Sequence, residues 1–469
     1  MGIAENIKEN LKLKIQNNLD RNYIRNILRI IGKRPVLAAY GATFSSRSDK
    51  YLNIATIKSI SCSYNPKNTV AYGSLFLPYE MFHALDLAPF LPEVMGGFTG
   101  GLGIADRTLK EASARWYTPD LCTFHRSASG AVELDIFPVP NFLICSNLAC
   151  DAAQKTFYMD AKKFGLEDNY YLIDTPYDND ESSIKYLAAQ LESVSVDICR
   201  KSGKKLDIRK FKKAIKLSNE FRQWAIKASD IRKELCMYPK GFDGLNFILP
   251  FHGLAGTKDA VDVYKTMYFE LNGFLKKQKR GNIKNTGIRR IGSGGRTSVN
   301  NVNSININNS NPSSGNGNAG SDKVKKILWL HLKPYYNNNL FNLLENNNYK
   351  VVFEEISNVY WPVLDPEKPF ESLAIKMLSH PLNGSVQNRV NAILKMAKDF
   401  NVDGVIMFAH WGCRHSNGGA RIIKDSLKEQ DIPMLLLDGD CLNKNNSSEG
   451  QMLTRLQGFM EIVDARYQY

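Results

Sequence analysis

The amino-acid sequence predicts an α/β protein with two Rossmann-like lobes, each built on a short parallel sheet, joined by a helical connector and separated by a cleft. Both halves of the chain alternate short apolar runs with longer amphipathic segments, the pattern of parallel strands covered by helices. A low-complexity tract separates the two halves. The chain has 469 residues, of which 43% are hydrophobic, and this length suits two or three domains with buried cores.

The first 200 residues are expected to contain a helical segment followed by the first lobe. Residues 1–40 are basic and amphipathic, and residues 41–200 form the N-terminal α/β lobe. Apolar runs predict strands at Thr69–Phe76, Asn141–Cys145 and Tyr170–Ile173. Helical periodicity predicts helices at Glu80–Leu87, Asp151–Phe164 and Ser182–Ser195.

Residues 201–272 are predicted to form the helical connector. Apolar side chains within residues 205–237 are spaced for a pair of helices, and Leu254–Leu271 continues the helical pattern. Residues 273–322 are first basic and then rich in Asn, Ser and Gly, and nine of the nineteen residues 300–318 are Asn. Such a composition buries too little apolar area to offset its chain entropy, so a disordered insert is expected.

Residues 323–469 are predicted to form the C-terminal α/β lobe with a four-stranded parallel sheet. The expected strands are Lys326–Leu332, Val351–Glu354, Gly404–Phe408 and Pro433–Leu437. The expected helices are Glu371–Ser379, Val386–Phe400 and Gly418–Glu429. A last helix begins with a capping-box pattern at Ser448–Gln451 and places one apolar face toward the core: Met452, Leu453, Leu456, Phe459, Met460 and Val463.

The net charge of +14 is concentrated outside the predicted lobes. Residues 276–296 carry eight Lys and Arg with no acid, and residues 1–34 carry eight against three acids, which leaves the rest near neutral. A basic tract in a Gly, Ser and Asn context is typical of a solvated loop, so no nucleic-acid partner is expected. No apolar run approaches the roughly 18 residues of a membrane span, and the N-terminus lacks a secretory h-region. The sequence therefore predicts a cytoplasmic protein without a membrane partner.

Eight cysteines in such a protein are expected to be thiols or metal ligands rather than disulfides. Cys150 follows the predicted strand Asn141–Cys145, and Cys413 follows the predicted strand Gly404–Phe408. Open parallel sheets bind ligands at the carboxyl ends of their strands, so two thiols from two lobes are expected to face one cleft. Cys122, in a predicted loop, is placed to supply a third. Spacing alone equally allows each to be an ordinary buried cysteine.

The order of residues around these cysteines resembles the family of 2-hydroxyacyl-CoA dehydratase and benzoyl-CoA reductase subunits of the D-component type. The resemblance covers nearly the whole chain outside residues 273–322. One departure is Ala84-Leu85-Asp86, where the family has a glycine. The stretches that carry the resemblance are Leu77–Phe82, Leu121–Arg126, Ser146–Asp151, Ile173–Tyr177, Asp403–Ile406, His410–Arg414, Ile432-Pro433, Asp438–Asp440, Gly450-Gln451 and Thr454-Arg455.

The resemblance implies an oxygen-sensitive [4Fe-4S] cluster held by Cys122, Cys150 and Cys413, the positions that match the family's ligand cysteines. Thiolates suit iron–sulfur clusters, and three protein ligands leave one iron with an exchangeable position. Cys145 is an alternative to Cys150, and Cys441 is either a fourth ligand or a bystander.

Residues beside the proposed ligands are candidates for shaping the site. His410, Trp411 and Arg414 flank Cys413, and the resemblance implies that they tune the cluster, with plain packing or ion pairing as the alternative. Structural roles near the last strand are expected for Asp438, Asp440, Thr454 and Arg455.

The activity that the resemblance implies is that of a (R)-2-hydroxyacyl-CoA dehydratase, a lyase that eliminates water by a ketyl-radical mechanism. Its implied partners are a homologous second subunit in a heterodimer, an acyl-CoA substrate and an ATP-dependent iron–sulfur activator. The chain has no Gly-x-x-x-x-Gly-Lys-Ser/Thr loop, so ATP use is expected in another protein. A benzoyl-CoA reductase-like subunit, a double-cubane-cluster reductase and an electron-relay subunit remain alternatives.

Overall fold

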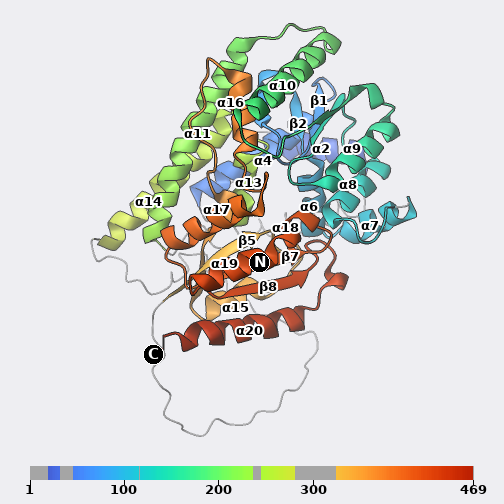
Figure 1. Cartoon of the computed structure of the whole chain (residues 1–469). Coiled ribbons are helices and arrows are strands. Elements are labelled where there is room, and N and C mark those ends of the chain that lie inside the picture. The colour runs from blue at the N-terminus through green and yellow to red at the C-terminus, as the bar shows by residue number, and fades with distance from the viewer. Residues whose placement is uncertain (1–19, 32–45, 116, 236–243, 280–323, 468–469) are drawn as a thin grey trace.

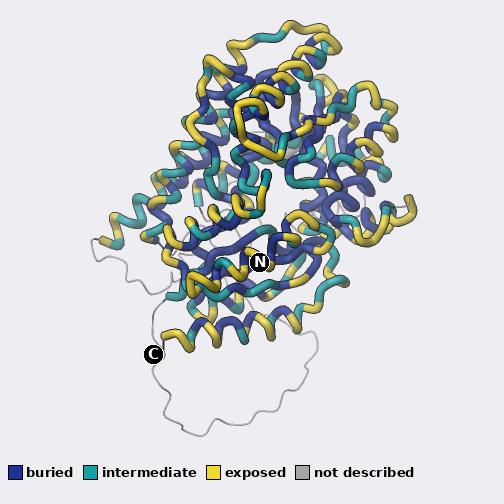
Figure 2. Tube along the Cα trace, in the orientation of Figure 1, coloured by how far each residue is buried: buried dark blue, intermediate teal, exposed yellow. Residues whose placement is uncertain are grey.

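The computed structural model describes residues 20–31, 46–115, 117–235, 244–279 and 324–467. Two four-stranded parallel sheets form the protein's two centres, with the strand orders β2-β1-β3-β4 and β6-β5-β7-β8. Helices surround both sheets (Figure 1), and most of the sheet residues are buried while the outer turns of the helices are exposed (Figure 2). The predicted α/β class with two parallel sheets is therefore confirmed.

The N-terminal sheet contains one strand that the sequence did not indicate. Its strands are β1 (Val70–Gly73), β2 (Ala88–Phe90), β3 (Phe142–Ser146) and β4 (Tyr170–Ile173). The short strand β2 contains Pro89, which normally argues against a strand, but β2 lies at the sheet edge, where proline is tolerated. Its three residues are also too few to show a period-2 pattern.

Eight helices and one short 3₁₀ turn (Glu167–Asn169) belong to the described part of the N-terminal 201 residues. Helices α6 to α8 were not predicted, because α6 contains four glycines and α8 is rich in small and polar residues. Of the predicted N-terminal helical segment, α2 is described and the remainder lies outside the described residues. The helices are α2 (Arg21–Ile31), α4 (Arg47–Ser63), α5 (Tyr79–Ala84), α6 (Pro92–Leu102), α7 (Ala105–Ala114), α8 (Thr123–Glu133), α9 (Asp151–Phe164) and α10 (Glu181–Lys201).

The departure from the family pattern near α5 has a conformational explanation. Asp86 has a φ of 53°, in the left-handed region where glycine is favoured and aspartate is tolerated. Its carboxylate lies 2.6 Å from Lys210 Nζ on the connector helix, a contact that glycine lacks.

The connector differs from the prediction of two helices within residues 205–237. Residues Ile208–Glu234 form one continuous helix, α11, and its packing partner is α14 (Lys258–Lys279). A 3₁₀ turn (Leu245–Phe247) and α13 (Ile248–Phe251) lie between them. Helix α14 continues through Lys279, so the first residues of the expected insert are helical, and residues 280–322 lie outside the described part. None of the described helices is both long and apolar enough to span a bilayer.

The C-terminal sheet has the four predicted strands. These are β5 (Lys325–His331), β6 (Tyr349–Glu354), β7 (Gly404–His410) and β8 (Met434–Gly439). All seven residues of β7 are buried, because β7 lies between β5 and β8 with helices on its faces.

The C-terminal helices match the predictions with two corrections. The predicted helix Gly418–Glu429 begins earlier and is divided into α18 and α19. Ser448 is the N-cap residue of the last helix, but its side chain accepts no capping hydrogen bond, so the capping box is wrong. The predicted apolar face of that helix is buried, with Leu453 at its partly buried margin. The helices are α15 (Leu340–Asn346), α16 (Pro369–Leu378), α17 (Val386–Asp399), α18 (Arg414–Gly418), α19 (Ala420–Glu429) and α20 (Glu449–Ala465), with 3₁₀ turns at Glu355–Ser357 and Lys444–Asn446.

One C-terminal segment packs in the core of the N-terminal lobe. Helix α16 packs against α10 and α11 (Figure 1), and Trp361, Phe370 and Leu373 share a hydrophobic core with Phe82 and Phe221. The two lobes are therefore joined by more than the helical connector, a feature that chain order did not indicate.

A buried ion pair lies inside this shared core. Lys376 Nζ on α16 lies 2.6 Å from Glu80 Oε1 on α5, and Ser218 on α11 donates to the same oxygen at 2.5 Å. Burial alone would raise the pKa of Glu80, but the Lys376 ammonium beside it lowers that pKa below its usual value. The carboxylate is thus ionised and depends on its partner.

We predict that Lys376→Met lowers the free energy of unfolding by about 3–5 kcal/mol, because Glu80 is left buried without its counter-charge. The double variant E80Q/K376M should lose less, since no unpaired carboxylate remains. Urea denaturation of the wild type, both single variants and the double variant measures the coupling. Equal stability of Lys376→Met and the wild type would contradict this role.

Candidate functional site

Each of the three predicted site cysteines is the N-cap residue of a helix. Cys122 precedes α8, Cys150 follows β3 and precedes α9, and Cys413 follows β7 and precedes α18. Backbone hydrogen bonds from the first helical turns favour the thiolate form of each sulfur. The residues that provide them are Phe124 and His125 for Cys122, Ala152 and Ala153 for Cys150, and Ser416 for Cys413.

The structure brings these three cysteines together from both lobes. The Cys413 and Cys150 thiols are close enough to raise the pKa of Cys122 electrostatically, and Cys150 does the same to Cys413. Gly412, with a φ of 78°, passes against Cys122 so closely that a Cβ atom there would lie 2.5 Å from the Cys122 amide nitrogen. The end of β7 therefore lies directly on the start of α8.

The environment of the thiols is apolar. Burial raises the pKa of Cys122 well above its ordinary value, that of Cys150 to about 12 and that of Cys413 to about 11. At neutral pH the thiols hold their protons unless a cationic centre binds them. Buried thiols with N–H donors aimed at their sulfurs suit a metal centre that releases those protons on binding.

The grouping does not have the spacing of a mononuclear site. Among the described residues, no three His, Cys, Asp or Glu side chains converge closely enough to hold one metal ion. A [4Fe-4S] cluster binds each thiolate through a different iron, so its ligands lie farther apart than those of a single ion.

His410, a predicted site residue, contacts one of the cysteines across the lobe boundary. It is fully buried at the end of β7, and its Nε2 lies 3.3 Å from Cys122 Sγ. Its Nδ1 accepts the backbone N–H of Cys441 at 3.1 Å. Burial lowers the pKa of His410 to about 4, so the ring is neutral at physiological pH.

His125 makes the corresponding contact to another cysteine, and sequence reasoning assigned it no role. Its Nε2 lies 3.2 Å from Cys150 Sγ, and its Nδ1 lies 3.1 Å from Thr156 Oγ1 on α9. The residue stands in the stretch Leu121–Arg126, so its position three residues after Cys122 was the available signal.

Two buried carboxyl groups lie around His125, and neither was predicted. Glu93 on α6 places Oε1 at 3.7 Å from His125 Nε2, and its Oε2 has no hydrogen-bond partner among the described residues. Burial raises the pKa of Glu93, and its charge raises the pKa of Cys150. Asp160 on α9 accepts a hydrogen bond from Ser129 at 3.2 Å, and burial raises its pKa to about 7.

The remaining cysteines divide into neighbours of the site and remote thiols. Cys145 is buried within β3, near Cys150, and Cys441 is buried near Cys122 and Cys413. Cys62 is exposed on α4 and Cys199 is buried on α10, whereas Cys236 lies outside the described residues.

The other candidate residues occupy the margin of the site. Arg414 forms an exposed ion pair with Asp151 at 3.1 Å, which joins the residues that follow Cys413 and Cys150. Half of the Trp411 side chain is exposed.

The residues near the last strand have the structural roles expected of them. Asp440 is buried and accepts hydrogen bonds from Thr123 Oγ1 and from the backbone of the loop after β8. Arg455 pairs with Asp438, and Thr454 donates to the Gly450 carbonyl.

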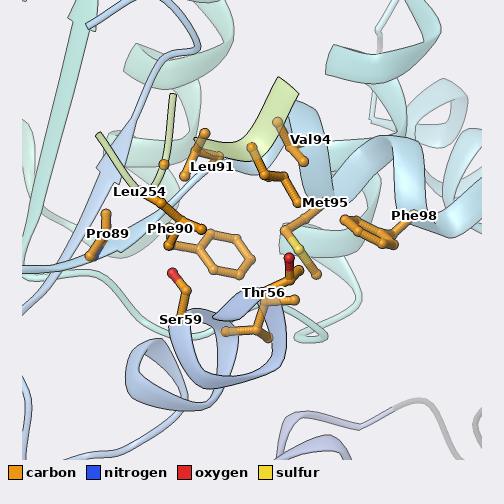
Figure 3. Close-up of a pocket in the computed structure, with 12 residues that line it drawn as sticks. Thr56, Ser59, Pro89, Phe90, Leu91, Val94, Met95, Phe98 and Leu254 are labelled. Carbon is orange, nitrogen blue, oxygen red and sulfur yellow. The ribbon is translucent and has the colours of Figure 1, made fainter. Parts of the chain in front are cut away.

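An apolar cavity of about 390 Å³ lies at the carboxyl end of β2 (Figure 3). Its wall includes Leu91, Val94, Met95 and Phe98, on the face of α6 away from Gly96, which packs on α8. It does not include the cysteines. The cleft expected between the lobes therefore stays a prediction.

Comparison with known families identifies the chain. The family "2-hydroxyglutaryl-CoA dehydratase, D-component" matches residues 74–463, which include both sheets and all three site cysteines. The chain belongs to this dehydratase D-component family.

Individual members of the D-component family are distant in sequence. The (R)-phenyllactyl-CoA dehydratase alpha subunit of Clostridium sporogenes is 23% identical over 83% of this chain and 88% of its own length. The alpha subunit of (R)-2-hydroxyglutaryl-CoA dehydratase from Acidaminococcus fermentans is 21% identical over 70% of this chain and 61% of its own. A benzoyl-CoA reductase subunit of Thauera aromatica is 20% identical over 84% and 89%. The dehydratase relatives are alpha subunits by name, so they belong to enzymes of more than one subunit.

The contact between the lobes at Gly412 gives a first prediction for the site. Gly412→Ala should destabilise the protein by about 1–3 kcal/mol, because the new methyl group meets Cys122 and the φ angle is left-handed. Gly418→Ala is the matched control, since a Cβ atom there meets nothing within 4 Å. Chemical denaturation measures both variants, and equal losses would contradict the argument.

Asp160 gives a prediction about pH. Its folded pKa of about 7 lies above the ordinary value, so the folded state binds more protons and stability falls as pH rises from about 4 to 7. Asp160→Asn should flatten this dependence and raise stability above pH 7 by up to about 4 kcal/mol. Urea denaturation across this pH range tests it, with the exposed Asp106→Asn as control. An unchanged pH slope in Asp160→Asn would refute the assignment.

Proposed function

We propose that this chain is the iron–sulfur subunit of a (R)-2-hydroxyacyl-CoA dehydratase, which eliminates water from a 2-hydroxyacyl-CoA after one-electron activation. The observation that carries the proposal is the meeting of Cys122, Cys150 and Cys413 at one boundary between two parallel sheets. Family membership and the names of the dehydratase relatives support it.

Cys122, Cys150 and Cys413 are proposed to hold a [4Fe-4S] cluster. The backbone N–H groups of the helix starts would stabilise the bound thiolates, and the apolar surroundings would exclude water and oxidants. When bound, such a cluster supplies a low-potential electron and an open iron position for an oxygen of the substrate.

The chain's own part in the chemistry is to position and shield. Gly412 holds the Cys413 turn against Cys122, and the pair Arg414–Asp151 lies at the exposed margin. Glu93, with a raised pKa and one unpartnered oxygen among the described residues, is a buried group able to hold a proton beside His125. The proposed partners are a homologous second subunit and an ATP-dependent iron–sulfur activator, with an acyl-CoA as substrate.

A reductase of the same architecture is the second candidate. It is favoured by the likeness to the benzoyl-CoA reductase subunit of Thauera aromatica, which covers 84% of the chain. A relay subunit that only passes electrons would require a fourth cysteine ligand, and Cys441 is the nearest candidate by its coupling to Cys122 and Cys413.

Iron binding tests the ligand set. After anaerobic reconstitution, Ala variants of Cys122, Cys150 and Cys413 should each retain less than about half of the wild-type iron, because a cluster with two protein thiolates is poorly held. Cys62→Ala and Cys199→Ala should retain it. Iron and sulfide assays with the visible spectrum measure the outcome, and unchanged iron in all three Ala variants would remove the cluster from this chain.

Product analysis separates the reactions. With the second subunit and activator present, a dehydratase converts a 2-hydroxyacyl-CoA to the enoyl-CoA without net electron consumption. A reductase consumes electrons for each product formed. If Cys441→Ala alone opens a coordination position, as judged by binding of an external iron ligand, the relay alternative is favoured.

A further inference from the structure

Two buried histidines, from different lobes, each contact the sulfur of a different proposed cluster ligand. His410 Nε2 lies 3.3 Å from Cys122 Sγ, and His125 Nε2 lies 3.2 Å from Cys150 Sγ. The exposed fractions of His410 and His125 are 0% and 4%. Both contacts are therefore shielded from water, where a hydrogen bond to sulfur has its largest electrostatic effect.

The main chain fixes the tautomer of His410. The backbone N–H of Cys441 points at Nδ1 from 3.1 Å, so Nδ1 accepts a hydrogen bond and carries no proton. The ring proton is then on Nε2, the atom that faces Cys122. Packing against the edge of Phe124, with ring centres 5.2 Å apart and planes at 81°, holds the ring in this orientation.

Thr156 orients the ring of His125. Its hydroxyl lies 3.1 Å from His125 Nδ1 and 3.1 Å from the Ala152 carbonyl. A thiolate at Cys150 accepts hydrogen bonds only, so the hydrogen-bonded form has the proton on His125 Nε2 and the hydroxyl donating to Nδ1. The side chain that supplies the hydroxyl is on the same helix that Cys150 caps.

We propose that His410 and His125 are positioning residues that donate N–H hydrogen bonds to the Cys122 and Cys150 sulfurs and thereby raise the reduction potential of the bound cluster. This inference rests on the proposed function. Reduction adds negative charge, part of which lies on the thiolate sulfurs, and an N–H donor stabilises the reduced state more than the oxidised state. Removal of either donor should make the cluster harder to reduce.

Two substitutions at each position separate the hydrogen bond from packing. His410→Asn keeps an acceptor near the Nδ1 position for the Cys441 N–H but has no donor that reaches Cys122. His410→Gln keeps a donor near the Nε2 position. The same pair of variants is made at His125. His83→Asn is the control, because His83 Nε2 contacts the Gly253 carbonyl rather than a sulfur.

The midpoint potential of the anaerobically reconstituted cluster, followed by EPR, is the readout. Both Asn variants should shift it to a more negative value, both Gln variants should shift it less, and His83→Asn should leave it unchanged. Equal potentials in the Asn variants and the wild type would overturn the inference. Equal shifts in Asn and Gln variants would assign the effect to packing and overturn it as well.

A measurement on the unsubstituted protein keeps the test independent of variant folding. In protein labelled with ¹⁵N-histidine, pulsed EPR of the reduced cluster should show ¹⁵N coupling and an exchangeable proton, and their absence would refute the two hydrogen bonds. Failure of the unsubstituted chain to bind iron would instead refute the proposed function.

Discussion

The site depends on one backbone contact between the lobes. At the end of β7 the chain turns through Gly412, in the left-handed region, and lies against the amide of Cys122. A side chain at this position has no room, so the contact fixes how the carboxyl end of the C-terminal sheet meets the start of α8. The Thr123–Asp440 hydrogen bond of 2.7 Å lies at the same boundary and is buried. Together these contacts set the distance between thiols that come from different lobes.

Helix α8 is the element that the contact positions. A Cβ atom at Gly96 would lie 2.4 Å from the Phe124 carbonyl, and one at Gly130 would lie 1.9 Å from that of Thr108, so α6 and α7 both approach α8 closely. Ser127 Oγ lies 2.6 Å from the hydroxyls of both Thr99 and Thr108, which satisfies polar groups in this dry interface. The helix is held on three sides, and its N-cap Cys122 has little freedom.

The electrostatics of the site follow from its burial. The groups that contact the cysteine sulfurs are neutral histidines, with buried carboxyl groups of raised pKa behind them. Arg414, the charged residue next to Cys413, is exposed and paired with Asp151. Arg389 lowers the pKa of Cys413, but its charge is already balanced by a buried pair with Glu355 at 2.6 Å, and burial still leaves that pKa raised. Such an environment stabilises the protonated thiols until a cationic centre binds, and it limits thiolate chemistry to the bound state.

The sequence by itself determined the α/β class, seven of the eight strands and the positions of the cysteines after β3 and β7, because parallel strands have continuous apolar runs and ligands gather at their carboxyl ends. It also indicated the family through short motifs. Only the tertiary structure decided the edge strand β2, the glycine-rich α6 and the packing of α16 on the other lobe, since burial overrode local propensity there. Likewise, Glu93 and His125 became site residues through contacts between distant helices, and no spacing along the chain encodes those contacts.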